Sequence, residues 1–280
     1  MNEPKQTNNT IGAILLESGK LGVDDADRIM VYQKAQGLRF GDAAVKLGLL
    51  SEEDIQMAVS KQFDYSFLSI EDESVDRCLI SAFVTHGPEV EAFKKLRAQL
   101  SMRWFSENKS IVVTSPRSKV GTSYISANLA VMFAQSGHKT LLIDANMRNP
   151  CQQKCFRNPN KAGLSDVLAN RAGLDCILPI KGLNNLSVLF SGTVPPNPLE
   201  LLGKSRFAKL SAELSGRYDV IIIDSPSMLN YSDTELLVSV AKGALLVARK
   251  NKTEIADLQK ANHQIEVSGA VALGVVMNEF

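Results

Sequence analysis

The sequence predicts an α/β protein with two parts, a doubly wound parallel sheet preceded by a small all-α repeat domain. Two observations lead to this fold class. From about residue 110 onward, short apolar runs alternate with helix-length segments, whereas residues 10–62 contain two copies of one helical unit. With 45% hydrophobic residues, a chain of 280 residues can bury one large core and one small one.

The alternating part is expected to form the sheet. Its apolar runs are rich in Val, Ile and Leu at successive positions, as parallel strands buried between two helix layers must be. The predicted strands are residues 110–115, 140–145, 186–192, 219–226, 243–249 and 272–278. Helices are expected between them, including residues 123–136, 199–214 and 253–267. Strand, helix and strand in this order favour right-handed crossovers and therefore a doubly wound sheet.

The N-terminal part repeats itself with a shift of 29 residues, which matches Gly12 to Gly41, Gly19 to Gly48, Leu21 to Leu50, Asp25 to Asp54 and Gln33 to Gln62. Each copy predicts a short apolar helix, a glycine-containing turn and a second amphipathic helix. Ser51 followed by Asp54 predicts a capping box at the start of the last helix. The glycines are either turn residues that end helices or part of a binding motif, and the residues alone leave both open.

These patterns divide the chain into four segments. We expect a disordered N-terminus at residues 1–9, the helical tandem-repeat domain at 10–70, a linker at 71–88 and the sheet domain at 89–280.

Composition limits the classes of function. The chain has 31 Lys and Arg against 30 Asp and Glu, so no broad basic surface for nucleic acid or an anionic membrane is expected. No apolar run approaches the roughly 20 residues that span a bilayer, and the polar beginning of the chain is not a signal segment. The four cysteines lack the spacing of a zinc site and are expected to be reduced thiols. We therefore expect a cytoplasmic protein with no nucleic-acid partner.

Residues 115–123, SPRSKVGTS, connect the first predicted strand to a helix. Backbone N–H groups in such a loop can hold phosphates, a Lys reaches the terminal phosphates and a hydroxyl ligates Mg²⁺. Gly121 and Ser123 fit the pattern GxxxxGK[ST], but Thr122 occupies the Lys position, and Arg117 and Ser118 stand where glycines are usual. On the loop alone, an ordinary turn capped by Ser123 is the better explanation.

Two carboxylates at the ends of other predicted strands change that balance. Asp144 ends the run LLID and Asp224 ends the run VIIID. A carboxylate at the end of a buried strand is costly unless it is hydrogen-bonded, ion-paired or bound to a cation. Either Asp alone is most simply a cap or turn residue. Together with Ser123, they indicate a P-loop NTPase-like sheet in which one hydroxyl and two carboxylates form a plausible set of ligands for a hydrated Mg²⁺ at the carboxyl ends of the strands.

Five segments of the sheet domain carry a specific resemblance: IDANMRNP, GLSDVL, SGTVPPNPLELL, YDVIIIDSP and VARKNKT. Their order and spacing resemble those of the bacterial tyrosine kinases of the exopolysaccharide chain-length system. The stretch TVPPNPLELL, residues 193–202, discriminates best, because the related cell-division and chromosome-partitioning ATPases share the fold without it. The resemblance covers residues 89–280, and together with the N-terminal repeat it is similar to the EpsG type, a soluble kinase paired with a separate membrane protein.

The resemblance implies transfer of the γ-phosphoryl group of ATP to protein tyrosine, in control of polysaccharide chain length. It implies a membrane-spanning chain-length determinant as partner, whose cytoplasmic end activates the kinase and could hold it at the inner membrane. Asp144 then belongs to the second acidic motif and Asp224 to the Walker B motif, with Ser123 and Asp144 close to Mg²⁺.

The segment EAFKKLR resembles the ExxRxxR oligomerisation motif of this family, at Glu91, Lys94 and Arg97. The three residues would share one helix flank and could contact a neighbouring subunit in a homo-oligomer. Lys94 stands where Arg is usual, which weakens a two-pronged ion pair. A solvated charged helix face is an equally good explanation of the same residues.

Three departures from the family put catalysis in question. Thr122 removes the positive charge that neutralises the migrating phosphoryl group, which should slow transfer by orders of magnitude. Asn146 replaces the second acid of the DxD pattern, so Asp144 would act alone. The last tyrosine is Tyr231, so an acceptor tyrosine is expected on a partner or at Tyr231 itself. Arg117 and Lys119 could reach the phosphates in place of the missing Lys.

The N-terminal copies resemble the N-terminal domain of type II secretion and pilus assembly ATPases, where tandem RLGxxLxxxG motifs bind cyclic di-GMP. The second copy fits the motif at Arg39, Phe40, Gly41, Gly48 and Gln62. The first copy has Thr10 in place of the Arg, which removes a guanidinium that could hold phosphate. Binding of cyclic di-GMP at residues 10–62 is therefore an open hypothesis.

Three functions remain after this reading of the sequence. The first is a tyrosine kinase of exopolysaccharide assembly that uses ATP and Mg²⁺. The second is a catalytically weak or inactive pseudokinase scaffold in the same pathway. The third is a positioning ATPase of the cell-division and partitioning type.

Overall fold

The computed structural model describes residues 10–62, 67–158, 161–203 and 205–279. The chain forms two compact units that divide between Ser69 and Ile70. The disorder predicted for residues 1–9 lies outside the described residues. None of the helices in the described part of the chain combines the length and the apolar character needed to cross a membrane.

The first unit consists of α1 (Ile11–Glu17), α2 (Val23–Gln36), α3 (Phe40–Lys46) and α4 (Glu52–Gln62). The helix starts repeat at the spacing seen in the sequence, since Ile11 and Phe40 begin equivalent helices, as do Val23 and Glu52. The four helices bury one small core. Its buried residues are Leu15, Leu21, Ala26, Ile29, Ala43, Ala44, Leu50 and Ala58.

The repeated glycines of this unit have structural roles. Gly19 and Gly48 follow α1 and α3 with φ of +69° and +66°, a conformation that glycine adopts without strain. A Cβ on Gly41 would lie 2.8 Å from Cγ2 of Ile55, so the glycine allows α3 and α4 to approach closely. The capping box is confirmed, because Asp54 N donates to Ser51 Oγ and Ser51 N donates to Asp54 Oδ2, both at 3.1 Å.

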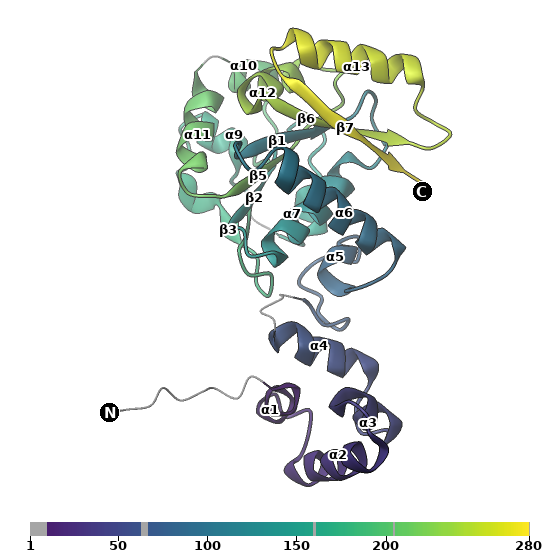
Figure 1. Ribbon diagram of the computed structural model, residues 1–280. Helices are drawn as coiled ribbons and strands as arrows, with labels where there is room; N and C mark the ends of the chain where they lie inside the picture. Colours follow the sequence, from purple (N-terminus) through teal and green to yellow (C-terminus); the bar gives the residue numbers. More distant parts are fainter. Residues whose placement is uncertain (1–9, 63–66, 159–160, 204, 280) are drawn as a thin grey trace. The chain divides into compact units, whose positions relative to one another are not determined.

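The second unit is built on a seven-stranded sheet, which confirms the predicted fold class (Figure 1). Its strands are β1 (Ser110–Thr114), β2 (Thr140–Asp144), β3 (Leu178–Pro179), β4 (Leu186–Leu189), β5 (Val220–Asp224), β6 (Gly243–Arg249) and β7 (Val271–Asn278). They lie in the order β3-β4-β2-β5-β1-β6-β7, and all neighbours are parallel except β3 and β4. The two-residue strand β3 is too short to show an apolar pattern, and the sequence did not predict it.

The helices of this unit are α5 (Ile80–Phe83), α6 (Pro88–Arg103), α7 (Thr122–Gln135), α8 (Gln152–Cys155), α9 (Leu164–Leu168), α10 (Pro198–Leu202), α11 (Arg206–Ser215), α12 (Asp233–Ala241) and α13 (Ile255–Val267), with a 3₁₀ turn at Leu174–Cys176. The helix α7 packs on β1, β2 and β5, and α5 and α6 pack on α7 (Figure 1). The helices α12 and α13 pack on β6, and α10 and α11 pack on α12.

Successive side chains along the central strands point to opposite faces of the sheet and so contact two different helix layers. Val112, Leu141 and Ile223 pack in one core with residues of α9, α11, α12 and α13, such as Leu164 and Leu237. The intervening strand residues are equally buried but face the other way, toward the layer of α7. Burial on both faces explains why the central strands read as uninterrupted apolar runs.

Three sequence expectations need correction. Residues 71–88 are not a free linker, because Cys78 O and Ser81 O accept hydrogen bonds from Asn128 and Gln135 of α7. The helix predicted at residues 199–214 is divided into α10 and α11, since Gly203 takes an extended conformation with ψ of 154°. The strand β7 lies at the sheet edge, and its residues Val271, Val275 and Met277 are 57%, 50% and 54% exposed.

Candidate active site at the carboxyl ends of β1, β2 and β5

Two aspartates occupy neighbouring positions at one edge of the sheet. The strands β2 and β5 are adjacent and parallel, and Asp144 and Asp224 are register partners at their ends. The strand β1 lies on the other side of β5, and the loop that follows it leads into α7. The topology therefore brings the loop at residues 115–123 next to both carboxylates.

Asp144 is held by backbone N–H groups. It is 0% exposed and accepts hydrogen bonds from Asn146 N at 3.2 Å, Cys151 N at 3.2 Å and Gln152 N at 3.1 Å. The loop that leaves β2 thus curls back over the carboxylate, and the start of α8 completes the ring of donors.

Asp224 is also 0% exposed, but it is held by side chains. Gln152 Nε2 donates to its Oδ2 at 2.7 Å, and Ser126 Oγ of α7 donates to its Oδ1 at 3.4 Å. The hydroxyl of Ser123 lies close enough to Asp224 to lower the pKa of that carboxyl. The structure therefore brings together Ser123, Asp144 and Asp224, three residues that the sequence had singled out.

Both carboxyl groups have raised pKa values. Burial raises the pKa of Asp144 well above its ordinary range, repulsion from Asp224 raises it further, and the backbone N–H groups lower it in part. Burial raises the pKa of Asp224 to about 6, against the opposing hydrogen bonds from Ser123, Gln152 and Ser126. Two buried carboxyl groups side by side favour either a shared proton or a cation between them.

Two residues of the loop before α7 have positive φ angles. Gly121 precedes α7 with φ of +95°, and Lys119 has φ of +63°, in the left-handed region that costs a side chain about 1 kcal/mol. The first N–H groups of a helix have no partner within it and can therefore hold an anion. The hydroxyl of Thr122 instead contacts the loop, donating to Ser115 Oγ at 3.0 Å.

Arg117 points to a carboxylate of the opposite layer. Its guanidinium forms a two-pronged pair with Asp257 of α13, from Nε at 2.5 Å and from Nη2 at 3.2 Å. The side chain of Asp257 is 7% exposed, whereas that of Arg117 is 61% exposed. To reach a phosphate, Arg117 would have to leave Asp257, so the structure does not place it with Ser123 and the two aspartates. Lys119 is exposed on the loop.

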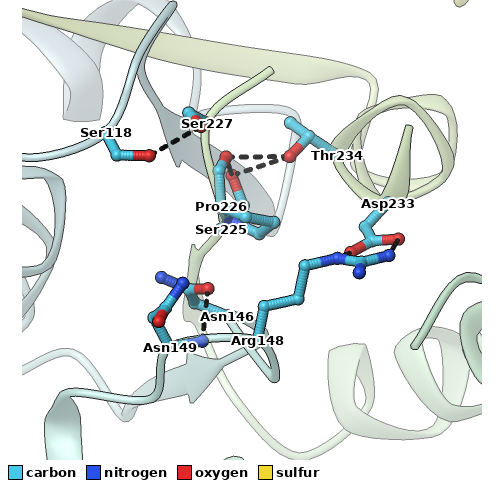
Figure 2. A network of polar contacts seen from close by, with 9 residues as sticks. All are labelled: Ser118, Asn146, Arg148, Asn149, Ser225, Pro226, Ser227, Asp233 and Thr234. Atoms are coloured by element: carbon cyan, nitrogen blue, oxygen red, sulfur yellow. Dashed lines mark hydrogen bonds and ion pairs between the residues drawn. The ribbon is translucent and has the colours of Figure 1, made fainter. Parts of the chain in front are cut away.

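The loop after β2 is tied to the segment after β5. Figure 2 shows Arg148 extending to Asp233 at the start of α12, with Nε to Oδ2 at 2.6 Å and Nη2 to Oδ1 at 3.1 Å. Arg148 also lies over the ring of Tyr231, 4.5 Å from its centroid. The side-chain oxygen of Asn146 accepts a hydrogen bond from Asn149 N at 3.2 Å, which closes the turn (Figure 2). Asn146 thus contacts Asp144 through its backbone N–H, while its side-chain oxygen serves the turn.

A further contact joins the loop before α7 to the segment after β5, since the hydroxyls of Ser118 and Ser227 are 3.1 Å apart (Figure 2). In the same segment, Thr234 Oγ1 donates to Pro226 O at 2.9 Å. All three loops at this edge are therefore connected to one another by side-chain contacts.

The donor set at this edge suits a hydrated divalent cation. Within the described part of the chain, no three His, Cys, Asp or Glu side chains converge as metal ligands. Two carboxylates, the hydroxyl of Ser123 and the carboxamide of Gln152 do converge here. Hard oxygen ligands in small number are what Mg²⁺ takes, because it keeps several of its own water molecules. The residues present therefore fit the cation expected with a nucleotide.

Two of the three residues of the expected oligomerisation motif, Glu91 and Lys94, have hydrogen-bond partners within the chain. Lys94 Nζ donates to Glu91 Oε1 and to Thr85 O, both at 2.8 Å. The Nε of Arg97 is buried and has no partner among the described residues. Contact of this helix with a second subunit stays a prediction.

The first unit has a groove of its own. It has a volume of about 480 Å³ and is lined by Leu38, Gly41, Asp42, Val45, Lys46, Glu52, Ile55 and Gln56. Thr10, at the position where the nucleotide-binding motif has Arg, caps α1 by accepting a hydrogen bond from Ala13 N. The lining carries both signs of charge, and binding of cyclic di-GMP stays a hypothesis.

Comparison with known proteins identifies the second unit. The AAA domain family matches residues 108–265. The putative tyrosine-protein kinase CapB of Staphylococcus aureus is 36% identical over 201 residues, which cover 70% of this chain and 88% of CapB. The chain belongs to the family of bacterial tyrosine-protein kinases.

Solved structures agree with this family. The crystal structure of the chimerical protein CapA2B2 is 35% identical, has a TM-score of 0.69, and covers 82% of this chain and 99% of that one. The septum site-determining protein MinD complexed with Mg-ADP, from Pyrococcus horikoshii, is 24% identical with a TM-score of 0.54, covering 61% of this chain and 70% of that one. The likeness to MinD shows a shared fold only. The EpsG type remains an expectation from the sequence.

Sequence reasoning missed several residues at the site of this tyrosine-kinase family member. Gln152 contacts both aspartates, yet it lies eight residues after Asp144, at the start of the four-residue helix α8, which is too short to show a periodic pattern. Arg148 stands inside the quoted segment IDANMRNP, but its partner Asp233 lies 85 residues further on. Asp257 was missed for the same reason. Such pairs could be found only from the three-dimensional arrangement.

Proposed function

We propose that this protein binds ATP with Mg²⁺ and transfers its γ-phosphoryl group to protein tyrosine at a reduced rate. One observation carries the proposal: Ser123, Asp144 and Asp224 meet at the end of three adjacent strands, where the loop at residues 115–123 begins α7. This is the place in a doubly wound sheet where ligands bind. Membership of the tyrosine-kinase family supports tyrosine as acceptor.

Different groups of the site would bind the phosphates and the cation. The N-terminus of α7 and the loop before it face the phosphates with backbone N–H groups, and Ser123, Asp144 and Asp224 would hold the cation. When bound, Mg²⁺ neutralises charge that develops on the transferred phosphoryl group. Asp144 and Asp224 become fully ionised in that state, because a cation replaces the proton that burial favours.

The transfer itself receives less help than is usual for a phosphoryl-transfer site. The tyrosine oxygen forms a bond to the γ-phosphorus, the bond from that phosphorus to the bridging oxygen of the departing ADP breaks, and the tyrosine proton passes to solvent water. Asn146 does not accept that proton, because a carboxamide is not a base and its oxygen closes a turn. Thr122 supplies no positive charge, and Arg117 is held by Asp257. Each of these three features predicts a slow reaction.

The three features also favour a second candidate, a pseudokinase scaffold that binds nucleotide without turnover. One experiment separates the two. Purified protein is incubated with γ-labelled ATP, Mg²⁺ and the cytoplasmic segment of the candidate membrane partner, and phosphotyrosine is measured. Label that disappears in Asp144→Ala supports the kinase. Nucleotide-dependent thermal stabilisation without label supports the scaffold. Tyr231→Phe tests the acceptor, since it removes the hydroxyl and keeps the ring beneath Arg148.

The pathway and location follow the family resemblance. We propose a cytoplasmic protein that acts in exopolysaccharide assembly beside a membrane-spanning chain-length determinant. The positioning ATPase is the remaining rival, and ATP hydrolysis stimulated by DNA or lipid vesicles, with no label on tyrosine, would favour it. The shared fold with MinD is the observation behind this rival.

A further inference from the structure

Gln152 lies at the centre of the candidate active site, although no motif in the sequence marks it. It is the first residue of α8 and is 0% exposed. Its backbone N donates to Asp144 Oδ2 at 3.1 Å. Its side-chain Nε2 donates to Asp224 Oδ2 at 2.7 Å and to Ser123 O at 3.1 Å. One residue thus joins the ends of β2 and β5 to the start of α7.

These contacts fix the orientation of the carboxamide. Both partners of Nε2 are oxygen acceptors, so an exchanged carboxamide would place Oε1 against a carboxylate and a carbonyl oxygen. The oxygen Oε1 must therefore point away from Asp224 Oδ2 and Ser123 O. It is buried, and within the described residues it has no hydrogen-bond partner.

A buried acceptor without a donor is unfavourable by about 1–3 kcal/mol. The cost is retained here beside Asp144 and Asp224, two fully buried carboxyl groups that have no basic partner within the described part of the chain. A hydrated divalent cation would relieve both, since its bound water molecules are strong donors and its charge balances the aspartates.

We propose that Gln152 is a positioning residue of the cation site: its amide nitrogen holds Asp224 and the Ser123 backbone, and its amide oxygen is an acceptor for the hydrated divalent cation. The inference rests on the proposed function, because it needs the cation that accompanies the nucleotide. It adds a fourth oxygen donor to Ser123, Asp144 and Asp224, and it explains why that oxygen is left without a partner in the fold.

Two substitutions separate this role from a purely structural one. Gln152→Met has nearly the same shape but loses the donors and the acceptor. Gln152→Glu loses only the donors and turns the acceptor into an anion. If Oε1 faces the cation, Mn²⁺ in the presence of ADP binds Gln152→Met about tenfold more weakly than the wild type, the size of one hydrogen bond to a charged group. Gln152→Glu then binds Mn²⁺ at least as tightly as the wild type.

The measurement is Mn²⁺ titration followed by electron paramagnetic resonance, on the full chain. The same comparison is read a second time as the rise in melting temperature on adding Mn²⁺ and ADP, which does not need a fully stable variant. Gln135→Met is the matched control, because Gln135 is a buried glutamine of α7 that donates to Ser81 O, away from the aspartates. Its Mn²⁺ affinity should equal that of the wild type.

The outcomes distinguish this inference from the function on which it rests. Equal weakening in Gln152→Met and Gln152→Glu would overturn the role of Oε1, because it would show that only the donor bonds matter. A wild-type protein that binds no Mn²⁺ with ADP would overturn both the cation site and the proposed function. Weak binding in Gln152→Met together with strong binding in Gln152→Glu supports the inference.

Discussion

Asp144 and Asp224 are register partners on adjacent parallel strands, and both side chains are fully buried. Within the described part of the chain, neither carboxylate is paired with a basic side chain. Their hydrogen bonds come from backbone and amide N–H groups and from a hydroxyl. Burying two ionised carboxylates side by side is therefore unfavourable. Protonation offsets this cost in the fold alone, and a bound cation would offset it with both groups ionised.

The aspartate pair makes stability depend on pH when no divalent cation is present. The pKa of Asp224 is about 6 in the folded state, against an ordinary 3.8. The contribution of this carboxyl group to the free energy of unfolding is therefore fully present below pH 3.8 and is lost as the pH rises through 6. A shift of this size corresponds to about 3 kcal/mol. We expect Asp224→Asn to be more stable than the wild type at pH 8 in a chelator, and the two to converge at low pH.

Urea unfolding at pH 5 and pH 8 measures this effect. Asp175→Asn, a change at an exposed aspartate of the same unit, is the control and should leave the pH dependence as in the wild type. Added Mg²⁺ and ADP should raise the stability of the wild type at pH 8 and not that of Asp224→Asn. A wild type whose stability does not fall between pH 5 and pH 8 would contradict the buried pair.

We expect Thr122 to limit the rate of the proposed transfer, because it leaves no basic side chain at the position before Ser123. Thr122→Lys restores that charge and loses only the contact of the Thr122 hydroxyl with Ser115. We expect faster tyrosine phosphorylation by about 10²-fold, the usual effect of one group that stabilises the transition state. Thr122→Gln, long and neutral, is the control and should not accelerate transfer. Equal rates in the two variants would mean that charge at this position is not what limits the reaction.

The pair between Arg117 and Asp257 restrains one of the two loop residues, Arg117 and Lys119, that were expected to replace the missing Lys. Asp257→Asn removes the charge that holds the guanidinium and leaves Arg117 free to turn toward a phosphate. We expect nucleotide affinity to increase severalfold in Asp257→Asn, as measured by fluorescent ADP, and the increase to vanish when Arg117→Ala is added. If the single and double variants bind nucleotide equally well, Arg117 has no role in binding.

The sequence predicts the sheet well because burial on both faces leaves a signal in consecutive residues. All six predicted strands are present, and the aspartates that end two of them could be placed at one edge from the order of elements alone. The prediction of one helix at residues 199–214 was wrong. The helix breaks at Gly203 because the backbone is extended there, and the helical pattern of the surrounding residues does not indicate this break.

The site was predicted only where its residues follow strands. Gln152, Asp233 and Asp257 contribute through contacts that span between 72 and 140 residues, and none belongs to a local pattern. At Asn146, the backbone N–H donates to Asp144 and the side-chain oxygen closes a turn with Asn149, an arrangement that the residue type alone does not predict. Residue type at the right spacing therefore predicts a candidate, whereas the direction of a side chain depends on neighbours distant in sequence.

The ion pair of Arg148 with Asp233 should stabilise the connection between the loop after β2 and the start of α12. The side chain of Asp233 is 2% exposed and that of Arg148 is 30% exposed, so removing the guanidinium leaves a buried carboxylate without its partner. We expect Arg148→Met to lower the free energy of unfolding by about 2–3 kcal/mol. Adding Asp233→Asn should recover more than half of the loss, because the double variant no longer buries an unpaired charge.

Urea unfolding of the two single variants and the double variant measures this coupling. Arg217→Met is the control, since Arg217 pairs with Glu213 on the surface at side-chain exposures of 55% and 52%. An exposed pair contributes roughly 0–1 kcal/mol, so this variant should be close to the wild type. If Arg148→Met lowers the free energy of unfolding no more than Arg217→Met does, the pair between Arg148 and Asp233 does not stabilise the fold. A large loss of stability in Arg148→Met would show that the pair with Asp233 holds the loop after β2, which carries Asn146, against the start of α12.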